Sequence, residues 1–461
     1  MGKIAVIGGG VAGVSSALLL DEEITLFERK ESLISGPPFC HLHAGGNLYP
    51  ELPLKECKQL LKESIDFAKV YPFSIDYRPT VVTFPKSCLK SPSEYIKKLE
   101  SIKSEYEALI AKDSSNKILG EPKEYYRVYN KDDIINFRKK EIVANPKTPN
   151  EWMISFSHYV NIDELQFPVI LIQEYGLNMF QSAAFGELLL SKKENVDLKL
   201  NTRVFDVKRV GEKFVVSYES GDALLQEKFD YVINAAGFLS GKIDDALGYK
   251  REKLVEFKAA YVSKWDVGVK FPEIIFHGKR GTPQGMAQFT PYAGGYFQLH
   301  GMTKDVTLFK NGLVKSANGL SYAKLDKSFL EKIDFGWSAD EAKLRTQRAI
   351  KHFSKFMPKF SQEAKVTTTP LFGAQQIPGS NPELRAAEVS FEKSYARCEI
   401  VKVSSAIAMV KAIAKEFDFK FTTKYLSNIE PKELESLARK IAKTRNYPEE
   451  LANILNQKKS L

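Results

Sequence analysis

The first 28 residues combine a short apolar run, spaced glycines, a second apolar run and an acidic residue. Ile4–Ile7 is apolar and partly β-branched, which predicts a buried strand. Gly8–Gly13 follows it and fits the pattern G-x-G-x-x-G, and Val14–Leu20 then predicts an apolar helix. Ile24–Phe27 predicts a second strand, which ends at Glu28. This order predicts a β–α–β unit at the amino terminus.

Each part of this unit has a physical role in binding a dinucleotide. Gly8 permits the tight turn, Gly10 lets the backbone approach a diphosphate, and Gly13 lets helix and strand pack closely. The helix N-terminus offers free N–H groups and a partial positive charge to the diphosphate. Glu28 stands where a carboxylate can bind a ribose diol. The unit therefore predicts a dinucleotide site; the alternative is a glycine-rich turn in an unrelated α/β protein.

The kind of acidic residue and its place in the chain separate two dinucleotides. Glu rather than Asp at position 28, and the position of the motif at the very start of the chain, favour FAD over NAD. Four separated stretches then resemble the D-amino-acid oxidase/glycine oxidase family of FAD-dependent oxidoreductases, over roughly residues 1–417. They are Gly8–Glu28; the loop from Ser35-Gly36 to His43–Leu48; Asn201–Val204 with Tyr231–Gly237; and Thr369-Pro370 to Ile377–Gly379 with a helix over Ser404–Lys415.

This resemblance implies which residues contact the cofactor. They are Gly8, Gly10, Val11, Ala12, Gly13, Glu28, Arg29, His43, Ala44, Gly45, Gly46, Val204, Ala235, Ala236, Gly237, Ser404 and Ser405. His43–Gly46 also resembles the H-A-A-G of family members that attach FAD covalently through the histidine. We expect non-covalent FAD, with covalent attachment through His43 as the alternative.

The resemblance also implies an α/β fold in which a Rossmann-like FAD-binding domain is discontinuous. Its pieces are residues 1–80, 170–250 and 365–420. Residues 81–169 are expected to be a helical insertion, residues 251–364 a substrate-binding α+β domain with an antiparallel sheet, and residues 421–461 a helical C-terminal appendage. Within the insertion, Ser91, Pro92 and Glu94 predict a helix start.

Catalysis by a flavin needs few protein groups beyond those that hold the substrate carbon against it. Gly294–Gly301 resembles a family strand that roofs the flavin, so Gln298 and His300 are candidate pocket residues. Arg397, just before the last flavin-facing helix, is a candidate for binding a substrate carboxylate, and an ion pair with Glu399 is its alternative interpretation. Arg251, Arg385, Lys258 and Lys264 are weaker candidates, for which a surface or structural role is the simpler expectation.

Composition limits the other possibilities. The net charge of +10 permits contact with nucleic acid or anionic lipid without requiring it. Four scattered cysteines indicate a reducing compartment, and no apolar stretch approaches the length of a membrane span. His41 and His43 are the nearest approach to a ligand set, and we expect no metal. We expect a cytoplasmic protein, with peripheral attachment to the inner face of the membrane as the alternative.

The sequence thus predicts an FAD-dependent oxidoreductase that removes a hydride from the carbon bearing the amine or hydroxyl of a small amino or 2-hydroxy acid. A second hypothesis is an FAD-dependent tRNA wobble-uridine modification enzyme, because Ala44–Pro50 resembles a G-A-L-Y-P stretch of such enzymes. The missing methyltransferase domain and the absence of one dense arginine patch oppose it. Two further hypotheses are a quinone-linked dehydrogenase at the membrane surface and a non-catalytic flavin-binding redox module whose partner binds residues 430–461.

Overall fold

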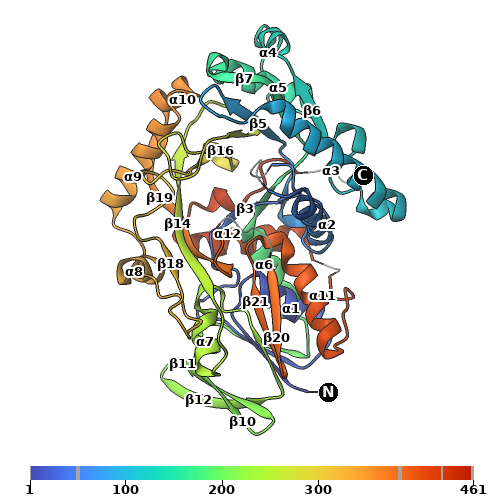
Figure 1. Ribbon diagram of the computed structural model, residues 1–461, viewed down its shortest axis with the longest axis vertical. Coiled ribbons are helices and arrows are strands. Elements are labelled where there is room, and N and C mark those ends of the chain that lie inside the picture. Colours follow the sequence, from blue (N-terminus) through green and yellow to red (C-terminus); the bar gives the residue numbers. More distant parts are fainter. Residues whose placement is uncertain (1, 48–51, 383–386, 427–428, 458–461) are drawn as a thin grey trace.

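The computed structural model describes residues 2–47, 52–382, 387–426 and 429–457, and Figure 1 shows how its elements are arranged. The amino-terminal motif lies in the middle of a six-stranded sheet. The strand order is β20 (Glu388–Glu392), β21 (Tyr395–Glu399), β13 (Tyr231–Asn234), β1 (Ile4–Ile7), β2 (Ile24–Phe27) and β9 (Val196–Lys199). Neighbouring strands are parallel except β20 and β21. The predicted strands at 4–7 and 24–27 are confirmed.

Both faces of this sheet are buried, which explains the uninterrupted apolar sequence of β1. Ile4 and Val6 pack into the core on one face, and Ala5 and Ile7 pack on the other. On the first face, α1 (Val11–Leu19) lies against α6 (Met179–Leu190) and α11 (Ala406–Phe417). The second face is covered by a three-stranded meander of β10 (Thr202–Val210), β11 (Lys213–Ser220) and β12 (Ala223–Phe229).

A second sheet of nine strands forms the other half of the molecule (Figure 1). Its order is β18 (Leu313–Lys315), β14 (Lys253–Lys264), β17 (Tyr296–Gly301), β16 (Ala287–Pro291), β15 (Glu273–Phe276), β5 (Thr80–Pro85), β7 (Leu165–Ile172) and β6 (Tyr126–Tyr129), with β19 (Lys365–Pro378) paired to β14. The pairing is antiparallel except between β15 and β5. Beside it lie α8 (Lys327–Phe335), α9 (Ala339–His352) and α10 (Pro358–Glu363), of which α9 packs on β14, β17 and β19.

The segment 81–169 contains helices and strands. Its helices are α3 (Pro92–Lys112), α4 (Lys131–Arg138) and α5 (Pro149–Tyr159), and its strands β5, β6 and β7 belong to the second sheet. The hydroxyl of Ser91 accepts a hydrogen bond from the Glu94 backbone N–H, so α3 begins as predicted. A smaller sheet of β3 (Phe39–His41), β8 (Gly176–Asn178) and β4 (Ile75–Asp76) connects the two halves near α2 (Leu54–Val70).

The chain ends with α12 (Pro431–Thr444) and a segment that we call the C-terminal strap, residues 445–457. Helix α12 packs on α6, and the strap then crosses to the second half of the molecule. Asn178 Nδ2 donates to the carbonyl of Leu451, and the Tyr77 N–H donates to the carbonyl of Asn456. These layers confirm the predicted α/β class: a Rossmann-like sheet, a second, largely antiparallel sheet and a C-terminal helical segment.

Candidate functional site

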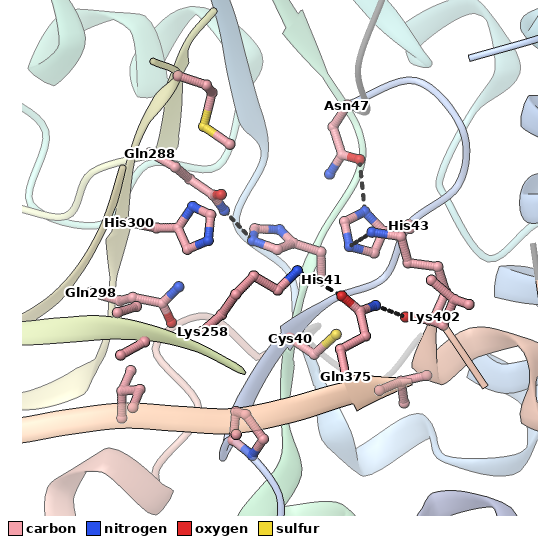
Figure 2. A pocket seen from close by; sticks show the side chains of 18 of the residues that line it. Cys40, His41, His43, Asn47, Lys258, Gln288, Gln298, His300, Gln375 and Lys402 are labelled. Atoms are coloured by element: carbon pink, nitrogen blue, oxygen red, sulfur yellow. Dashed lines mark hydrogen bonds between the residues drawn. The ribbon is translucent and has the colours of Figure 1, made fainter. Parts of the chain in front are cut away.

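A cavity of about 340 Å³ lies between the second sheet and the loop that follows β3 (Figure 2). Strands β14, β16, β17 and β19 supply one wall, and the segment 37–47 with residues 401–403 supplies the other. The side chains that carry its polar chemistry are Cys40, His41, His43, Asn47, Lys258, His277, Gln288, Gln298, His300, Gln375 and Lys402. Among the described residues that line it, the formal charges are those of two lysines, and no carboxylate is present.

The glycine turn has the geometry that a diphosphate requires. Gly8 has a φ of +106°, and a Cβ on this residue would lie 2.4 Å from the Ala235 carbonyl oxygen. A Cβ on Gly13 would lie 1.9 Å from the Gly8 carbonyl oxygen. A Cβ on Gly10 would have no atom within 4 Å, so the space in front of the α1 N-terminus is open. These residues fit a dinucleotide, because the first turn of α1 points its backbone N–H groups into an open cradle.

Glu28 is buried at the end of β2, close to this turn. Its carboxylate accepts hydrogen bonds from the Gly9 N–H at 2.7 Å and the Lys30 N–H at 2.8 Å. Burial raises the pKa of Glu28, and the two backbone donors act against that rise. The carboxylate is therefore fixed beside the cradle, where a ribose diol would reach it.

The turn and the cavity are neighbours in space. The Ile34 N–H donates to the Gly9 carbonyl at 2.7 Å. Pro37, only three residues later, lines the cavity. Three residues of extended chain span at most about 11 Å, so one elongated ligand can contact both places.

The loop 43–47 is held from behind by a buried carboxylate, Glu174. Its oxygens accept hydrogen bonds from the backbone N–H groups of Gly46 at 2.6 Å and Asn47 at 3.0 Å, and from the Tyr125 hydroxyl at 2.9 Å. Burial is the main cause that raises the pKa of Glu174 to about 7. Glu174 therefore fixes the backbone on which His43 stands.

We expect Glu174→Gln to reduce the loss of stability between pH 4.5 and 7. A carboxyl whose pKa rises from 4.5 to about 7 on folding makes the native state bind more protons there, so the free energy of unfolding falls as pH rises. Glutamine does not titrate, and this contribution, on the order of 1–3 kcal/mol, should disappear. Urea unfolding from pH 4.5 to 8 measures it. Glu416→Gln, at an exposed position, is the control, and equal slopes in both variants would contradict the prediction.

His43 faces both the loop and the segment before α11. Its Nδ1 lies 3.3 Å from Asn47 Oδ1, and its Nε2 lies 3.2 Å from Lys402 Nζ (Figure 2). Ser404 and Ser405 follow in a 3₁₀ turn at the start of α11, and both are buried. The Ser405 hydroxyl donates to Glu63, whereas the Ser404 hydroxyl has no hydrogen-bond partner in the described structure.

His41 stands at the opposite side of the same wall. Its Nδ1 lies 3.0 Å from Oε1 of Glu273, an ion-pair distance without the angles of a hydrogen bond, and its Nε2 accepts a hydrogen bond from the side-chain amide of Gln288. The same amide nitrogen is 2.9 Å from Glu273 Oε1. Behind Glu273, Arg78 is 1% exposed, with its Nη2 3.4 Å from Glu273 and its Nη1 3.4 Å from Asp76. The cavity is thus connected to a buried charge network.

Sequence reasoning and structure differ most at the arginines. Gln298 and His300 line the cavity, as expected for that strand, and so does Lys258. Arg397 does not line it: its Nε donates to Asp244 at 2.7 Å and its Nη1 to Ser390 at 2.7 Å, so the residue is buried in an ion pair. Its carboxylate partner is Asp244 rather than the adjacent Glu399.

Of the other predicted residues, some form ion pairs away from the cavity and others lie beside the glycine turn. Arg251 pairs with Glu399 and Glu388, and Arg29 pairs with Asp334 at 3.2 Å on the surface. Ala235, Ala236 and Gly237 follow β13 beside the glycine turn, and Val204 lies on β10. Lys264 closes β14 near the Tyr296 ring. Arg385 and residues 48–50 lie outside the described part of the chain.

Several site residues had no signal in the sequence. Glu174, Glu273 and Arg78 are single charged residues in apolar surroundings, far apart along the chain, and only the pairing of β3, β8, β5 and β15 brings them together. Gln288 lies on β16 opposite His300 of β17. The alternation of polar and apolar residues in Ala287–Pro291 is the one pattern that could have predicted Gln288.

The described residues contain no group of three or more His, Cys, Asp or Glu that could hold a metal ion. Among the described helices, none has the length and apolar character needed to cross a membrane.

Solved structures resemble the chain over most of its length. The L-alpha-glycerophosphate oxidase from Mycoplasma pneumoniae, with FAD bound, gives a TM-score of 0.57 at 14% identity, covering 92% of this chain and 96% of that one. The L-proline dehydrogenase from P. horikoshii gives 0.53 at 14%, covering 90% and 93%. The glycine oxidase from Geobacillus kaustophilus gives 0.52 at 11%, covering 90% and 94%.

No protein-family model and no curated protein sequence matches the chain. The structural likenesses nevertheless confirm, at the level of the fold, the glycine oxidase resemblance predicted from four short stretches. This chain has the fold shared by these oxidases and dehydrogenases.

Proposed function

We propose that this protein binds FAD non-covalently and removes a hydride from the carbon bearing the hydroxyl or amine of a small 2-hydroxy or amino acid. The observation that carries the proposal is the glycine turn, with open space at Gly10, adjacent to a cavity of about 340 Å³ with two lysines in its lining. The fold likeness to a protein with FAD bound supports the choice of cofactor.

Different residues would bind different parts of FAD. Backbone N–H groups at the α1 N-terminus would hold the diphosphate, and Glu28 would bind the ribose diol. The loop 43–47 and the start of α11 would flank the flavin ring. When bound, the flavin supplies the two-electron acceptor for the hydride. The protein's part is to hold the substrate carbon, exclude water and move the remaining proton.

The lining favours a substrate with a negative charge. Lys258 Nζ lies 2.6 Å from Gln375 Oε1, and Lys402 is on the opposite wall, so both cations border the same space (Figure 2). Lys258 Nζ also lies 3.4 Å from Glu256 Oε2, so a carboxylate between the lysines would share Lys258 with Glu256 and gain a charge contact with Lys402. An ammonium group would find no carboxylate among the described lining residues, which favours a 2-hydroxy acid over an amino acid.

The alternatives from the sequence have no specific support in the described structure. Residues 48–50 of the stretch resembling the tRNA-modification enzymes lie outside the described residues. No observation distinguishes a quinone as acceptor, and we therefore propose neither the tRNA reaction nor the quinone-linked one.

The test is a substrate panel on the purified full chain. We expect one equivalent of FAD released by heat denaturation, which also distinguishes non-covalent from covalent attachment. Under anaerobic conditions, DL-lactate, DL-malate or DL-2-hydroxyglutarate should bleach the oxidised flavin absorbance, and the matching amino acids (alanine, aspartate, glutamate) should bleach it at least 10-fold more slowly. A chain that takes up no FAD after incubation with excess cofactor would refute the proposal. Faster bleaching by the amino acids would refute the preference for a hydroxyl.

A further inference from the structure

We propose that His41, oriented by Glu273, is the group that accepts the substrate's hydroxyl proton during oxidation. The inference rests on the proposed function and names a catalytic residue for it. His41 lines the cavity and Glu273 is buried directly behind it, 1% exposed.

The contacts of the two ring nitrogens determine where the His41 proton lies. The Gln288 amide nitrogen can only donate, so the Nε2 atom that it contacts must carry a lone pair. The ring proton is then on Nδ1, which lies 3.0 Å from the Glu273 carboxylate without forming a hydrogen bond to it in this structure. A neutral imidazole held in this tautomer presents a basic nitrogen toward the cavity side, with a carboxylate behind it.

Burial and the nearby cations keep His41 neutral before reaction. Burial is the main cause that lowers the pKa of His41 well below its ordinary value, and Arg78, Lys402 and His300 lower it further. Burial raises the pKa of Glu273 to about 7; Arg78 and Gln288 lower it, and Asp76 and Glu174 raise it. The imidazole is therefore available as a base, and the carboxylate behind it stabilises the imidazolium that forms.

The proposed step balances. The substrate carbon loses a hydride, two electrons and one proton, to the oxidised flavin, and the carbon–oxygen bond becomes a carbonyl. The hydroxyl proton moves to Nε2 of His41, with Gln288 displaced from that nitrogen by the substrate oxygen. The resulting imidazolium faces Glu273 through Nδ1. No reactant beyond the substrate and the proposed FAD is needed.

His277 provides a matched comparison in the same cavity. It is also a buried imidazole, and burial lowers its pKa to about 4. Its ring lies 4.8 Å from the Phe84 ring, and its Nε2 has no hydrogen-bond partner in the described structure. Among the described residues no carboxylate lies within ion-pair distance of His277, whereas His41 Nδ1 lies 3.0 Å from Glu273. His277→Asn therefore changes the same kind of side chain without touching the proposed pair.

The first experiment measures single-turnover flavin reduction from pH 5.5 to 9, using the hydroxy acid of the panel that bleaches fastest. In the wild type, the rate should fall as pH drops below about 7, because a protonated Glu273 no longer stabilises the imidazolium. We expect His41→Asn to lose about 10²–10³-fold in rate. Glu273→Gln should lose about 10-fold and the pH dependence near 7. His277→Asn should keep that pH dependence whatever its rate.

Chemical rescue and spectroscopy separate catalysis from structure. Added imidazole should raise the rate of flavin reduction in His41→Gly at least 10-fold, whereas a merely structural role of His41 predicts no such rescue. Two-bond ¹H–¹⁵N spectra of the FAD-loaded full chain should show one imidazole protonated on Nδ1 at pH 7, absent in His41→Asn. A cationic or Nε2-protonated His41, or an unchanged pH profile in Glu273→Gln, overturns the inference.

Failure of the inference is distinct from failure of the proposed function. If wild-type flavin is bleached by the hydroxy acid and His41→Asn is reduced at the wild-type rate, the function stands and His41 is not the base. If the wild type takes up no FAD, the proposed function fails first. Flavin content, measured in every variant before kinetics, distinguishes the two results.

Discussion

Replacing Gly10 by alanine is expected to weaken FAD binding by about 100-fold while the protein remains folded. The added methyl group meets no protein atom within 4 Å, so the fold has room for it. It would, however, occupy the open space in front of the α1 N-terminus, where the diphosphate must approach the backbone. A 100-fold change corresponds to about 2.7 kcal/mol of binding free energy.

Gly13→Ala is the matched control, because the same methyl group would stand 1.9 Å from the Gly8 carbonyl oxygen. That variant should unfold at markedly lower urea concentration, with or without cofactor. Fluorescence titration of apo-protein with FAD, together with urea unfolding, measures both effects. Wild-type FAD affinity in Gly10→Ala would place the cofactor elsewhere.

Replacing Arg78 by methionine should cost about 3–5 kcal/mol of stability. Arg78 lies between Asp76 and Glu273, at 3.4 Å from each, and its side chain is buried. Its removal leaves two buried carboxylates without their cation, which is more costly than the ion pairs themselves are favourable. The pKa of Glu273 should also rise further, since Arg78 is the largest influence that lowers it.

The double variant Arg78→Met with Glu273→Gln tests the cause of that loss. Removing one of the stranded charges should recover at least 1 kcal/mol relative to Arg78→Met alone. Chemical unfolding at pH 8, above the wild-type Glu273 pKa of about 7, gives the values. Additive losses in the double variant would show that packing, rather than charge, makes Arg78 important.

The elements closest to the glycine turn were the most predictable from sequence. Ile4–Ile7 and Ile24–Phe27 are short apolar runs bounded by glycine and acidic residues, and both are strands as expected. The α1 helix begins at Val11, three residues before the predicted start, because the helix N-terminus includes the glycine motif itself. Local pattern and global fold agree here.

The cavity was less predictable because its residues come from separate strands. The resemblance of Gly294–Gly301 to a family strand suggested Gln298 and His300, but no local signal connects His41 to Glu273, 232 positions later. Burial of a lone charge is decided by the pairing of β15 with β5 and β16, not by neighbouring residues. Arg397 shows the opposite case: its position just before α11 suggested a pocket residue, but its side chain pairs with Asp244.

The C-terminal strap has a consequence for biosynthesis. The Asn456 N–H donates to Asp76, 380 residues earlier, and β21 completes the sheet that β1 begins. At about 5–20 residues per second, a ribosome needs roughly 20–80 s between these two segments. Throughout that interval Asp76 lacks the Asn456 N–H, and β13 waits for β21, so we expect each contact to form only after its later partner has been synthesised.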